Sequence, residues 1–394
     1  MKKIPRVALF FEMSAVNDRR VMQGIVRYAS LRGPWVFYTK LHPFYMTRGK
    51  DIWHKRILPE LKSWSPDGII AHLDKQKAKE LIALNVPIII ESLVESEVSG
   101  RITFGDDNLS IGKTGAKYLL NLGFKNYAFC GFVGISWSQT RSEAFCKTVS
   151  TAGCNVFTYQ SRATHVHQNS FVVEDQQSLC DWLKSLPKPV AVMACNDARA
   201  QQIVDACNFS DLEVPDKVAV LGVDDDNLIC DLTNPQISSV ALGSEKMGYE
   251  AAAILDKLMT GKKPEQTALL NHPTNVVTRL STELLAIDDP EVAKAVRFIR
   301  NHRRFEITVD DVVEATCLGR RALENRFHKI LKRPIFREIR RVRVEQVARM
   351  LLETTLPVYK IADDLGYSSS EHIARPFRAE MGMSPQEYRL KHGF

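Results

Sequence analysis

The chain has 394 residues, of which 45% are apolar and 25% charged, and its net charge is +7. Length and composition are ordinary for a globular protein of two or three domains, each able to bury a core. No stretch approaches the roughly 20 apolar residues that a membrane-spanning helix needs, so the sequence predicts no such helix. About +5 of the net charge falls after residue 287, which favours nucleic acid as a partner of that part.

The chain begins MKKIPRVALFFEM, a basic start followed by an apolar run. Glu12 interrupts this run after five residues, so we interpret it as a first strand rather than a signal peptide. The eight cysteines are scattered without a C-x-x-C pair, and we expect reduced core residues in a cytoplasmic protein, with metal ligation or disulfides as the alternative.

Short apolar runs alternate with amphipathic segments up to about residue 271. This alternation predicts parallel sheets with right-handed crossovers, and nine strands are enough for two doubly wound α/β lobes. The predicted strands are 7–11, 35–39, 68–71, 87–90, 102–104, 127–131, 156–159, 190–194 and 218–223. The predicted helices are 18–31, 75–84, 109–122, 138–152, 178–186, 197–207 and 245–260.

Polar side chains follow the carboxyl ends of these strands, where open parallel sheets bind ligands, so we expect them to converge on one cleft. Carboxylates, amides, arginines and a flat aromatic ring suit a neutral polyhydroxylated ligand, because each hydroxyl both donates and accepts hydrogen bonds. The alternative that Asp and Asn at strand ends cap the next helix stays open. The candidate ligand contacts are Asp18, Arg19, Asp107, Trp137, Arg141, Asn196, Asp197 and Asp224.

Several stretches in this part resemble the effector domain of the LacI/GalR repressors, itself similar to periplasmic sugar-binding proteins. They are GDDNLSIGKTGAKYLLNLGFKNYAFCG at 105–131, R-x-x-x-F at 141–145, ACNDARA at 194–200, VAVLGVDDD at 218–226 and SSVALGSEKMGYEAAAIL at 238–255. The resemblance implies a two-lobed periplasmic-binding-protein-like fold, with sugar contacts from Arg141, Asn196 and Asp224. That family's N-terminal helix-turn-helix has no counterpart ahead of the first strand.

Apolar residues at three- and four-residue steps after Thr308 predict two short helices separated by a turn near 316–319, the outline of a helix-turn-helix. We expect Ala322, Leu323 and Phe327 to face inward on the second helix. Its outer face should read base edges and phosphates, although Arg320 could bind phosphate only. The residues of this outer face are Arg320, Arg321, Glu324 and Asn325.

The same pattern returns after about 50 residues, with a second unit over 358–389. Pro376 does not fit, because proline inside a helix removes a donor, so the second reading helix should be kinked or begin late. An arginine-rich helix at 335–352 joins the units; its arginines either contact phosphate or form a solvated face. A rigid joint of this kind would place the reading helices in successive major grooves, roughly 34 Å apart. The second unit's candidate DNA contacts are Ser370, Glu371, His372 and Arg375.

The doubled unit, the spacing A-x7-L-x3-F at 315–327 and the ending GMSPQEYR at 382–389 resemble the AraC/XylS family of DNA-binding domains. We predict a sugar-sensing domain at 1–280, a linker at 281–290 and an AraC-type domain at 291–394. Both parts in this order resemble a family of xylose-responsive regulators. That resemblance implies a D-xylose-dependent activator, with Asp18 and Arg19 as additional pocket residues; another pentose or sugar stays open. As a hypothesis about the mechanism, we expect a homodimer that recruits RNA polymerase.

An enzyme is the rival interpretation. The sequence has no G-x-x-x-x-G-K-[ST], G-x-G-x-x-G or G-x-S-x-G motif, and the consecutive carboxylates at 224–226 do not share one side of an element. We therefore predict no catalytic residue, metal or cofactor. A transport-type binding protein is disfavoured by the missing export signal and the basic C-terminal part.

Overall fold

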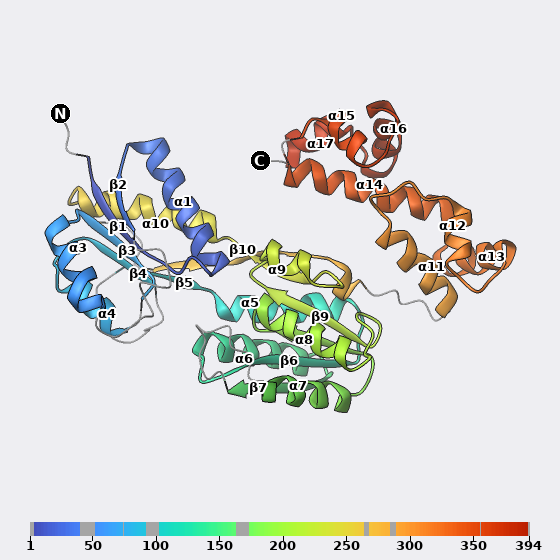
Figure 1. Cartoon of the computed structure of the whole chain (residues 1–394), viewed down its shortest axis with the longest axis horizontal. Helices are drawn as coiled ribbons and strands as arrows, with labels where there is room; N and C mark the ends of the chain where they lie inside the picture. The colour runs from blue at the N-terminus through green and yellow to red at the C-terminus, as the bar shows by residue number, and fades with distance from the viewer. Residues whose placement is uncertain are drawn as a thin grey trace. The chain divides into compact units, whose positions relative to one another are not determined.

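The chain divides into two units, Met1–Leu284 and Leu285–Phe394, in the computed structural model shown in Figure 1. The structure describes residues 4–39, 52–73, 75–91, 102–162, 173–263, 268–283, 289–354 and 356–392. Of the predicted linker, 284–288 lies outside these residues, whereas Ser281 and Thr282 are buried in the first unit. No helix within the described residues is long and apolar enough to cross a bilayer.

The first lobe of the first unit is a six-stranded sheet with strand order β11-β5-β4-β3-β1-β2, and every neighbouring pair is parallel. Its strands are β1 (Arg6–Phe10), β2 (Val36–Thr39), β3 (Gly68–Ala71), β4 (Ile88–Glu91), β5 (Ile102–Asp106) and β11 (Ala268–Asn271). Its helical segments are α1 (Val16–Arg32), η1 (Trp53–Ile57), α3 (Leu58–Trp64), α4 (Lys75–Ile82) and α10 (Ser244–Met259).

The second lobe is a six-stranded sheet with order β12-β10-β9-β8-β6-β7, in which only the β10–β12 pair is antiparallel. Its strands are β6 (Asn126–Val133), β7 (Asn155–Arg162), β8 (Val190–Ala194), β9 (Val218–Val223), β10 (Ser238–Leu242) and β12 (Pro273–Val277). Its helices are α5 (Asn108–Asn121), α6 (Ser136–Thr151), α7 (Val173–Ser185), α8 (Asp197–Phe209) and α9 (Asn227–Leu232), followed by the short η2 (Leu280–Thr282).

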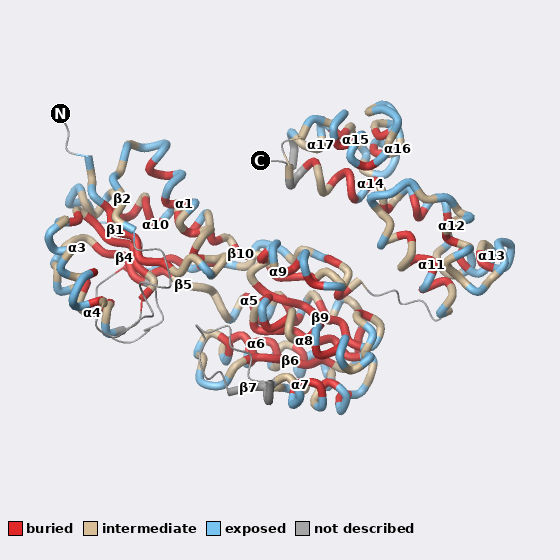
Figure 2. Tube along the Cα trace, in the orientation of Figure 1, coloured by how far each residue is buried: buried red, intermediate tan, exposed pale blue. Residues whose placement is uncertain are grey.

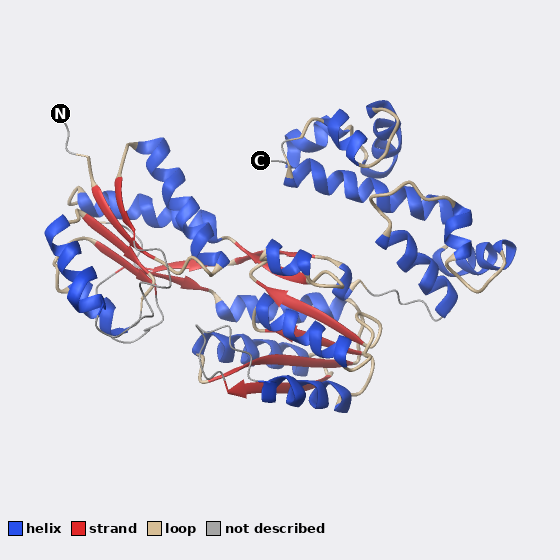
Figure 3. Ribbon diagram, viewed as in Figure 1, coloured by secondary structure: helices blue, strands red, loops and turns tan. Residues whose placement is uncertain are grey.

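Continuous apolar runs such as VAVMA and VAVLGV are buried along their whole length, because helices cover both faces of a parallel sheet. Figure 2 shows the central strands of both lobes as buried. All nine predicted strands and the two doubly wound sheets are confirmed. Strands β10, β11 and β12, which complete the sheets, were not predicted (Figure 3).

The chain passes between the lobes three times: from β5 into α5, from β10 into α10, and from β11 into β12. The carboxyl ends of β5, β10 and β11 therefore lie where the lobes join. Residues at these three crossings are neighbours in space although they are far apart in the sequence.

Helices α1 and α10 pack unusually closely in the first lobe, at two glycines. A Cβ on Gly24 would lie 1.9 Å from the carbonyl oxygen of Glu245, and a Cβ on Gly248 would lie 2.0 Å from that of Val21. Neither position can hold a larger residue unless the helices separate.

The second unit has two small cores that share one long helix. The first helix-turn-helix comprises α12 (Val309–Glu314) and α13 (Arg320–Leu331) and packs with α11 (Pro290–Asn301). The second comprises α15 (Val358–Asp364) and α16 (Ser370–Met381) and ends with α17 (Pro385–His392). Helix α14 (Ile335–Glu353) gives Ile335, Ile339 and Val342 to the first core and Val344, Val347 and Leu351 to the second.

The glycine contact between α1 and α10 gives a stability prediction. Alanine in place of a mid-helix glycine normally stabilises a helix by up to about 1 kcal/mol. We expect Gly24→Ala to destabilise the fold by roughly 1–3 kcal/mol instead, because its Cβ meets a backbone carbonyl rather than a movable side chain. Denaturant unfolding measures the change, with Gln23→Ala at the exposed neighbouring position as control. Equal stability of the two variants would contradict the close packing.

Candidate ligand site and DNA interface

Six polar side chains form a ring of hydrogen bonds, closed by one ion pair, where the two lobes join, and we call it the interlobe ring. It consists of Asn17, Asp106, Arg141, Asp224, Ser244 and Asn271. Asn17 Nδ2, from the first lobe, donates to Asp224 Oδ1 of the second lobe at 2.9 Å. Ser244 Oγ in turn donates to Asn17 Oδ1 at 3.0 Å.

The other half of the ring passes through the third crossing. Asn271 Nδ2 donates to Ser244 Oγ at 3.0 Å and to Asp106 Oδ1 at 2.8 Å. Arg141 donates from Nη2 to Asp106 Oδ2 at 2.8 Å, and its Nη1 lies 3.9 Å from Asp224 Oδ1. Because Asp106, Ser244 and Asn271 stand at the three crossings, the ring ties the hinge between the lobes to Arg141 and Asp224.

Arg141 is the best-anchored predicted residue, with 3% of its surface exposed. Its Nε donates to Asn108 Oδ1 at 2.8 Å and its Nη1 to the carbonyl of Cys195 at 2.7 Å. The Trp137 ring centre lies 5.0 Å from the guanidinium carbon, on the same helix α6. Trp137 is half-buried, so one part of this aromatic surface faces out of the protein core.

Two predicted residues do cap helices. Asn196 Oδ1 accepts from the amide of Arg199 at the start of α8. Asp107 Oδ1 accepts from the amide of Ser110 at the start of α5, and its Oδ2 lies 2.9 Å from His272 Nδ1. Burial alone would raise the pKa of Asp107, but these hydrogen bonds bring it below its ordinary value. Within the described part of the chain, Asn196 Nδ2 makes no hydrogen bond, so this donor is available to a ligand.

Two other predicted residues are held inside the protein. Asp18 is 5% exposed, accepts from the amide of Glu12, and lies 2.9 Å from His72 Nδ1, so it fixes the end of β3 to the start of α1. Asp197 is 1% exposed and accepts from the amide of Asp226 at 2.7 Å and from Ser239 Oγ at 2.6 Å. Asp197 thus holds in place the neighbouring loop that contains Asp226.

That loop, Asp224–Asp226, has an unusual backbone. Asp224 and Asp225 have φ angles of +102° and +51°, a region that residues other than glycine rarely adopt. Side chains hold the loop in this shape: Ser239 Oγ accepts from the amide of Asp225, and Arg20 donates to the carbonyls of Asp224 and Asp225, both at 2.6 Å. Arg20 belongs to the first lobe, so it bonds across the lobe boundary.

Arg19, the remaining predicted residue, binds mainly its own loop. It donates to the carbonyls of Met13 and Ser14, and its guanidinium lies 3.5 Å from the carboxylate of Asp226. The structure therefore brings together Arg141, Trp137, Asn196 and Asp224, and places Asp18 and Asp197 in supporting positions.

Five further residues complete the site and were not predicted, namely Asn17, Arg20, Asp106, Ser244 and Asn271. Asn17 and Arg20 flank the two chosen residues of the run NDRR, so the motif was located but its contacting members were missed. Asp106 precedes the chosen Asp107 by one position. Asn271 had no signal, because β11 was not predicted.

Burial raises the pKa of Asp224 to about 7, the nearby Asp106 carboxylate adds to this effect, and Arg141 and Asn17 oppose it. Burial and the charge of Asp224 also raise the pKa of Asp197. Hydroxyl donors of a neutral ligand would stabilise the charged form of Asp224, which burial disfavours.

The outer face of α13 carries the first set of predicted DNA contacts. Arg320, Arg321 and Asn325 are exposed, Glu324 is half-exposed, and Leu323 and Phe327 are fully buried, as predicted. Ala322 is exposed, so its predicted inward position is wrong. Arg320 donates to Asp310 at 2.8 Å and to Glu324 at 3.2 Å, which occupies it within the protein.

Helix α16 carries the second set, of which Glu371, His372 and Arg375 are exposed and Ser370 half-exposed. The helix begins at Ser370 and contains Pro376 in its interior, so the alternative of a later start is wrong. His372 Nδ1 lies 2.5 Å from Ser368 Oγ in the preceding turn.

Several arginines of α14 have partners within the protein, and among them the guanidinium of Arg340 lies 3.6 Å from the carboxylate of Glu380. Arg343 lies 4.0 Å over the Tyr367 ring and donates to the carbonyl of Leu365, which fastens the second helix-turn-helix to α14. Arg341 pairs at 2.7 Å with Glu338, a buried carboxylate that also binds Arg333 at 2.9 Å. Arg337 and Arg340 are exposed.

Known proteins and families resemble both units of the chain. Residues 116–282 match the model of a periplasmic binding protein-like domain, and residues 312–391 match a helix-turn-helix domain. A xylose operon regulatory protein of Haemophilus influenzae is 30% identical over 98% of each chain, and that of Escherichia coli K12 is 29% identical over 98% of this chain and 96% of its own. A solved xylose-binding transcription activator, xylR, is 28% identical, with a TM-score of 0.72 and full coverage of both chains.

Fold, site and comparisons define a transcription regulator in which a periplasmic-binding-protein-like sensor precedes an AraC-type helix-turn-helix domain. The chain matches its Haemophilus relative over nearly the whole length of both proteins. It belongs to the family of xylose operon regulatory proteins.

The raised pKa of Asp224 predicts a pH-dependent stability. Between its ordinary pKa of 3.8 and about 7, the folded protein keeps a proton that the unfolded chain releases, so stability falls as pH rises through this window. Asp224→Asn abolishes this titration while keeping an acceptor for Asn17. We expect the melting temperature of the variant, relative to that of the unmodified chain, to increase as the pH rises from 4 to 7. Above pH 7 the difference between the two melting temperatures should stay constant. Asp181→Asn, an exposed carboxylate of the same lobe, is the control; a pH-independent difference for Asp224→Asn would disprove the assignment.

Proposed function

We propose that this protein is a D-xylose-dependent activator of transcription that binds its sugar where the two lobes join. The observation that carries the proposal is the interlobe ring, which connects all three crossings to Arg141 and Asp224. A ligand bound to these two side chains acts directly on the hinge. The xylose-binding activator that this chain resembles, and the relatives named for xylose operons, support the choice of sugar.

The chemistry of the site supports a neutral polyhydroxylated ligand. Asp224 offers an acceptor in an environment rich in carboxylate, and Asn196 Nδ2 offers a donor. Trp137 presents an aromatic face on which the apolar side of a sugar ring stacks. An anionic ligand would meet the carboxylates of Asp106 and Asp224 and would be repelled.

Lobe closure is the proposed switch. Asn17 and Arg20 of the first lobe bind Asp224 and its loop in the second lobe, so these contacts exist only when the lobes are close together. A sugar that bridges the lobes favours this closed state, and it shifts the population in proportion to its preference for that state.

On the DNA side, we propose that α13 and α16 read successive major grooves as parts of a homodimer that recruits RNA polymerase in the cytoplasm. Helix α14 supports this proposal, because its contribution to both cores fixes the two reading helices relative to each other. The exposed side chains of Arg321 and Asn325 lie one turn apart on α13 and suit guanine and adenine.

The sugar assignment is tested by calorimetric titration with D-xylose, L-arabinose, D-ribose and D-glucose. We expect D-xylose to bind most tightly, and Asn196→Ser to weaken it by about tenfold to a hundredfold, because the amide donor is lost. Serine also caps helices well, so the melting temperature without sugar should change little. Tighter binding of another sugar would transfer the proposal to that ligand, and absence of any binding would reject a sugar-sensing role.

The DNA assignment is tested with duplexes selected from a random pool by the unmodified chain. We expect Asn325→Ala to weaken binding of the selected duplex by about 1–3 kcal/mol while binding to unrelated DNA is unchanged, because only a base contact is lost. Asn301→Ala, an exposed asparagine of the same unit outside the reading helices, is the matched control. If the two substitutions weakened binding equally, Asn325 would not be a base contact.

A further inference from the structure

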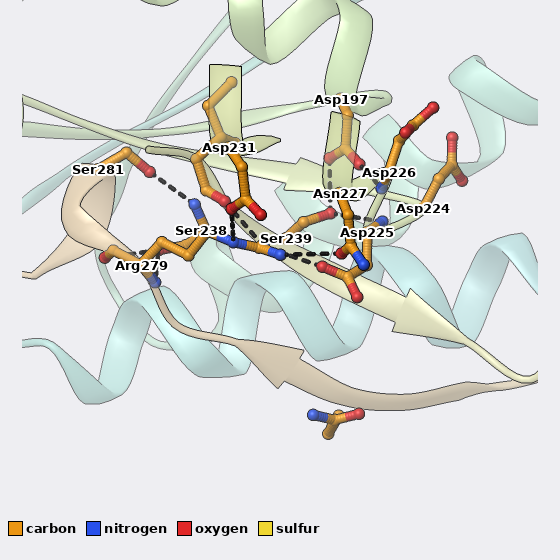
Figure 4. A network of polar contacts seen from close by, with 12 residues as sticks. Asp197, Asp224, Asp225, Asp226, Asn227, Asp231, Ser238, Ser239, Arg279 and Ser281 are labelled. Carbon is orange, nitrogen blue, oxygen red and sulfur yellow. Dashed lines mark hydrogen bonds and ion pairs between the residues drawn. The ribbon is translucent and has the colours of Figure 1, made fainter. Parts of the chain in front are cut away.

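A buried arginine connects the Asp224–Asp226 loop to the segment through which the chain leaves the sensor. Arg279 lies between β12 and η2, five positions before the first undescribed residue of the predicted linker, and is 6% exposed. Its Nη1 donates to Asp225 Oδ1 at 2.9 Å and its Nη2 to Asn227 Oδ1 at 3.2 Å. Its Nε donates to Asp231 Oδ1 at 3.1 Å (Figure 4).

The backbone on either side of Arg279 is held to β10 by buried hydroxyl groups. Ser238 Oγ accepts from the amide of Arg279 at 2.7 Å and also bonds to its carbonyl. Ser281 Oγ accepts from the amide of Ser238, and Thr282 Oγ1 donates to Ser238 Oγ at 2.7 Å. The exit of the sensor is therefore part of the same packed network as the loop, and a shift of the loop reaches η2 through few intervening atoms.

The loop itself has three separate attachments. Asp224 presents its side chain to the interlobe ring, and the carbonyls of Asp224 and Asp225 are bound by Arg20 of the first lobe. The Asp225 carboxylate accepts from Arg279 through Oδ1, as Figure 4 shows, and its Oδ2 lies 3.9 Å from Arg20. The left-handed backbone at both residues makes the three attachments dependent on one another, because a change of φ at Asp224 moves the peptide that carries Asp225.

We propose that Arg279 is a positioning residue that transmits the state of the Asp224–Asp226 loop to η2, and so couples sugar binding to the DNA-binding unit. This inference rests on the proposed function and adds its route of transmission. The route is a contiguous set of side chains within the sensor: Asp224, Asp225, Arg279 and the turn Leu280–Thr282. If bound sugar raises the affinity for DNA by some factor, bound DNA must raise the affinity for sugar by the same factor.

The test uses the full-length chain with Asp225→Asn, and Asp231→Asn as the matched control. Both carboxylates bind Arg279, but only Asp225 belongs to the loop, and the side chain of Asp231 is 53% exposed. Affinity for the selected duplex is measured with and without saturating D-xylose, and sugar affinity by calorimetry. We expect Asp225→Asn to retain D-xylose affinity within about threefold. The factor by which D-xylose increases its DNA affinity should be smaller than in the unmodified chain by about tenfold or more. Asp231→Asn should keep that gain.

A second measurement separates transmission from simple destabilisation. Hydrogen exchange of the amides at Leu280–Glu283 should change on D-xylose addition in the unmodified chain and in Asp231→Asn, but not in Asp225→Asn. Arg279→Lys, which keeps the positive charge without the forked geometry, should restore part of the coupling that Arg279→Met loses.

The outcomes separate the two proposals. If the unmodified chain shows no sugar-dependent DNA affinity, the proposed function fails, and this inference with it. If that chain responds and Asp225→Asn responds equally, or if both carboxylate variants lose the same amount, transmission through Arg279 alone is rejected.

Discussion

The sensor depends on one electrostatic arrangement, a buried guanidinium surrounded by more carboxylate than it can neutralise. Arg141 binds Asp106 directly and lies 3.9 Å from Asp224, while burial raises the pKa values of Asp224 and Asp197. Excess buried charge of this kind is unfavourable without further donors. The hydroxyls of a neutral sugar are such donors. We propose that this need for donors makes the site selective for a neutral polyhydroxylated ligand.

The sequence predicted where the candidate site lies better than it predicted which residues form it. Strand-end stretches such as ACNDAR and GVDDDN were recognised because parallel sheets place ligands at that edge, a rule that needs no tertiary information. Asn271 could not be found in this way, because its strand was missed and its role arises only where three crossings meet. Arg20 was missed for a related reason: its partners are backbone carbonyls of the other lobe, some 200 residues away in the chain.

Capping a helix does not use every polar atom of a side chain, so a capping residue can still offer a donor to a ligand. Asn196 caps α8 with Oδ1 and keeps Nδ2 for another partner, and the cap fixes the direction in which that donor points. Asp197, the next residue, uses both oxygens to support the loop of 224–226, and its carboxylate fits only because Gly222 has no side chain, since a Cβ there would lie 2.1 Å from Asp197 Oδ1. Residue type and position at a strand end therefore do not distinguish a ligand contact from the residue that orients it.

The DNA-binding unit shows the opposite balance, since periodicity alone predicted most of it. Helices α13 and α16 bury Leu323, Phe327, Ile373 and Phe377 at the spacing read from the sequence, because a short helix has one buried stripe and little else to decide its orientation. Ala322 was misplaced because alanine is small enough for either face. The interior proline of α16 is tolerated within a helix that packs through Ile373 and Phe377 against α14, whose side chains also complete the first core. Packing of a shared helix thus outweighs a local propensity that, at roughly 3 kcal/mol, would end an isolated helix. Because α14 contributes to both cores, a movement of this helix would displace both helix-turn-helix units together.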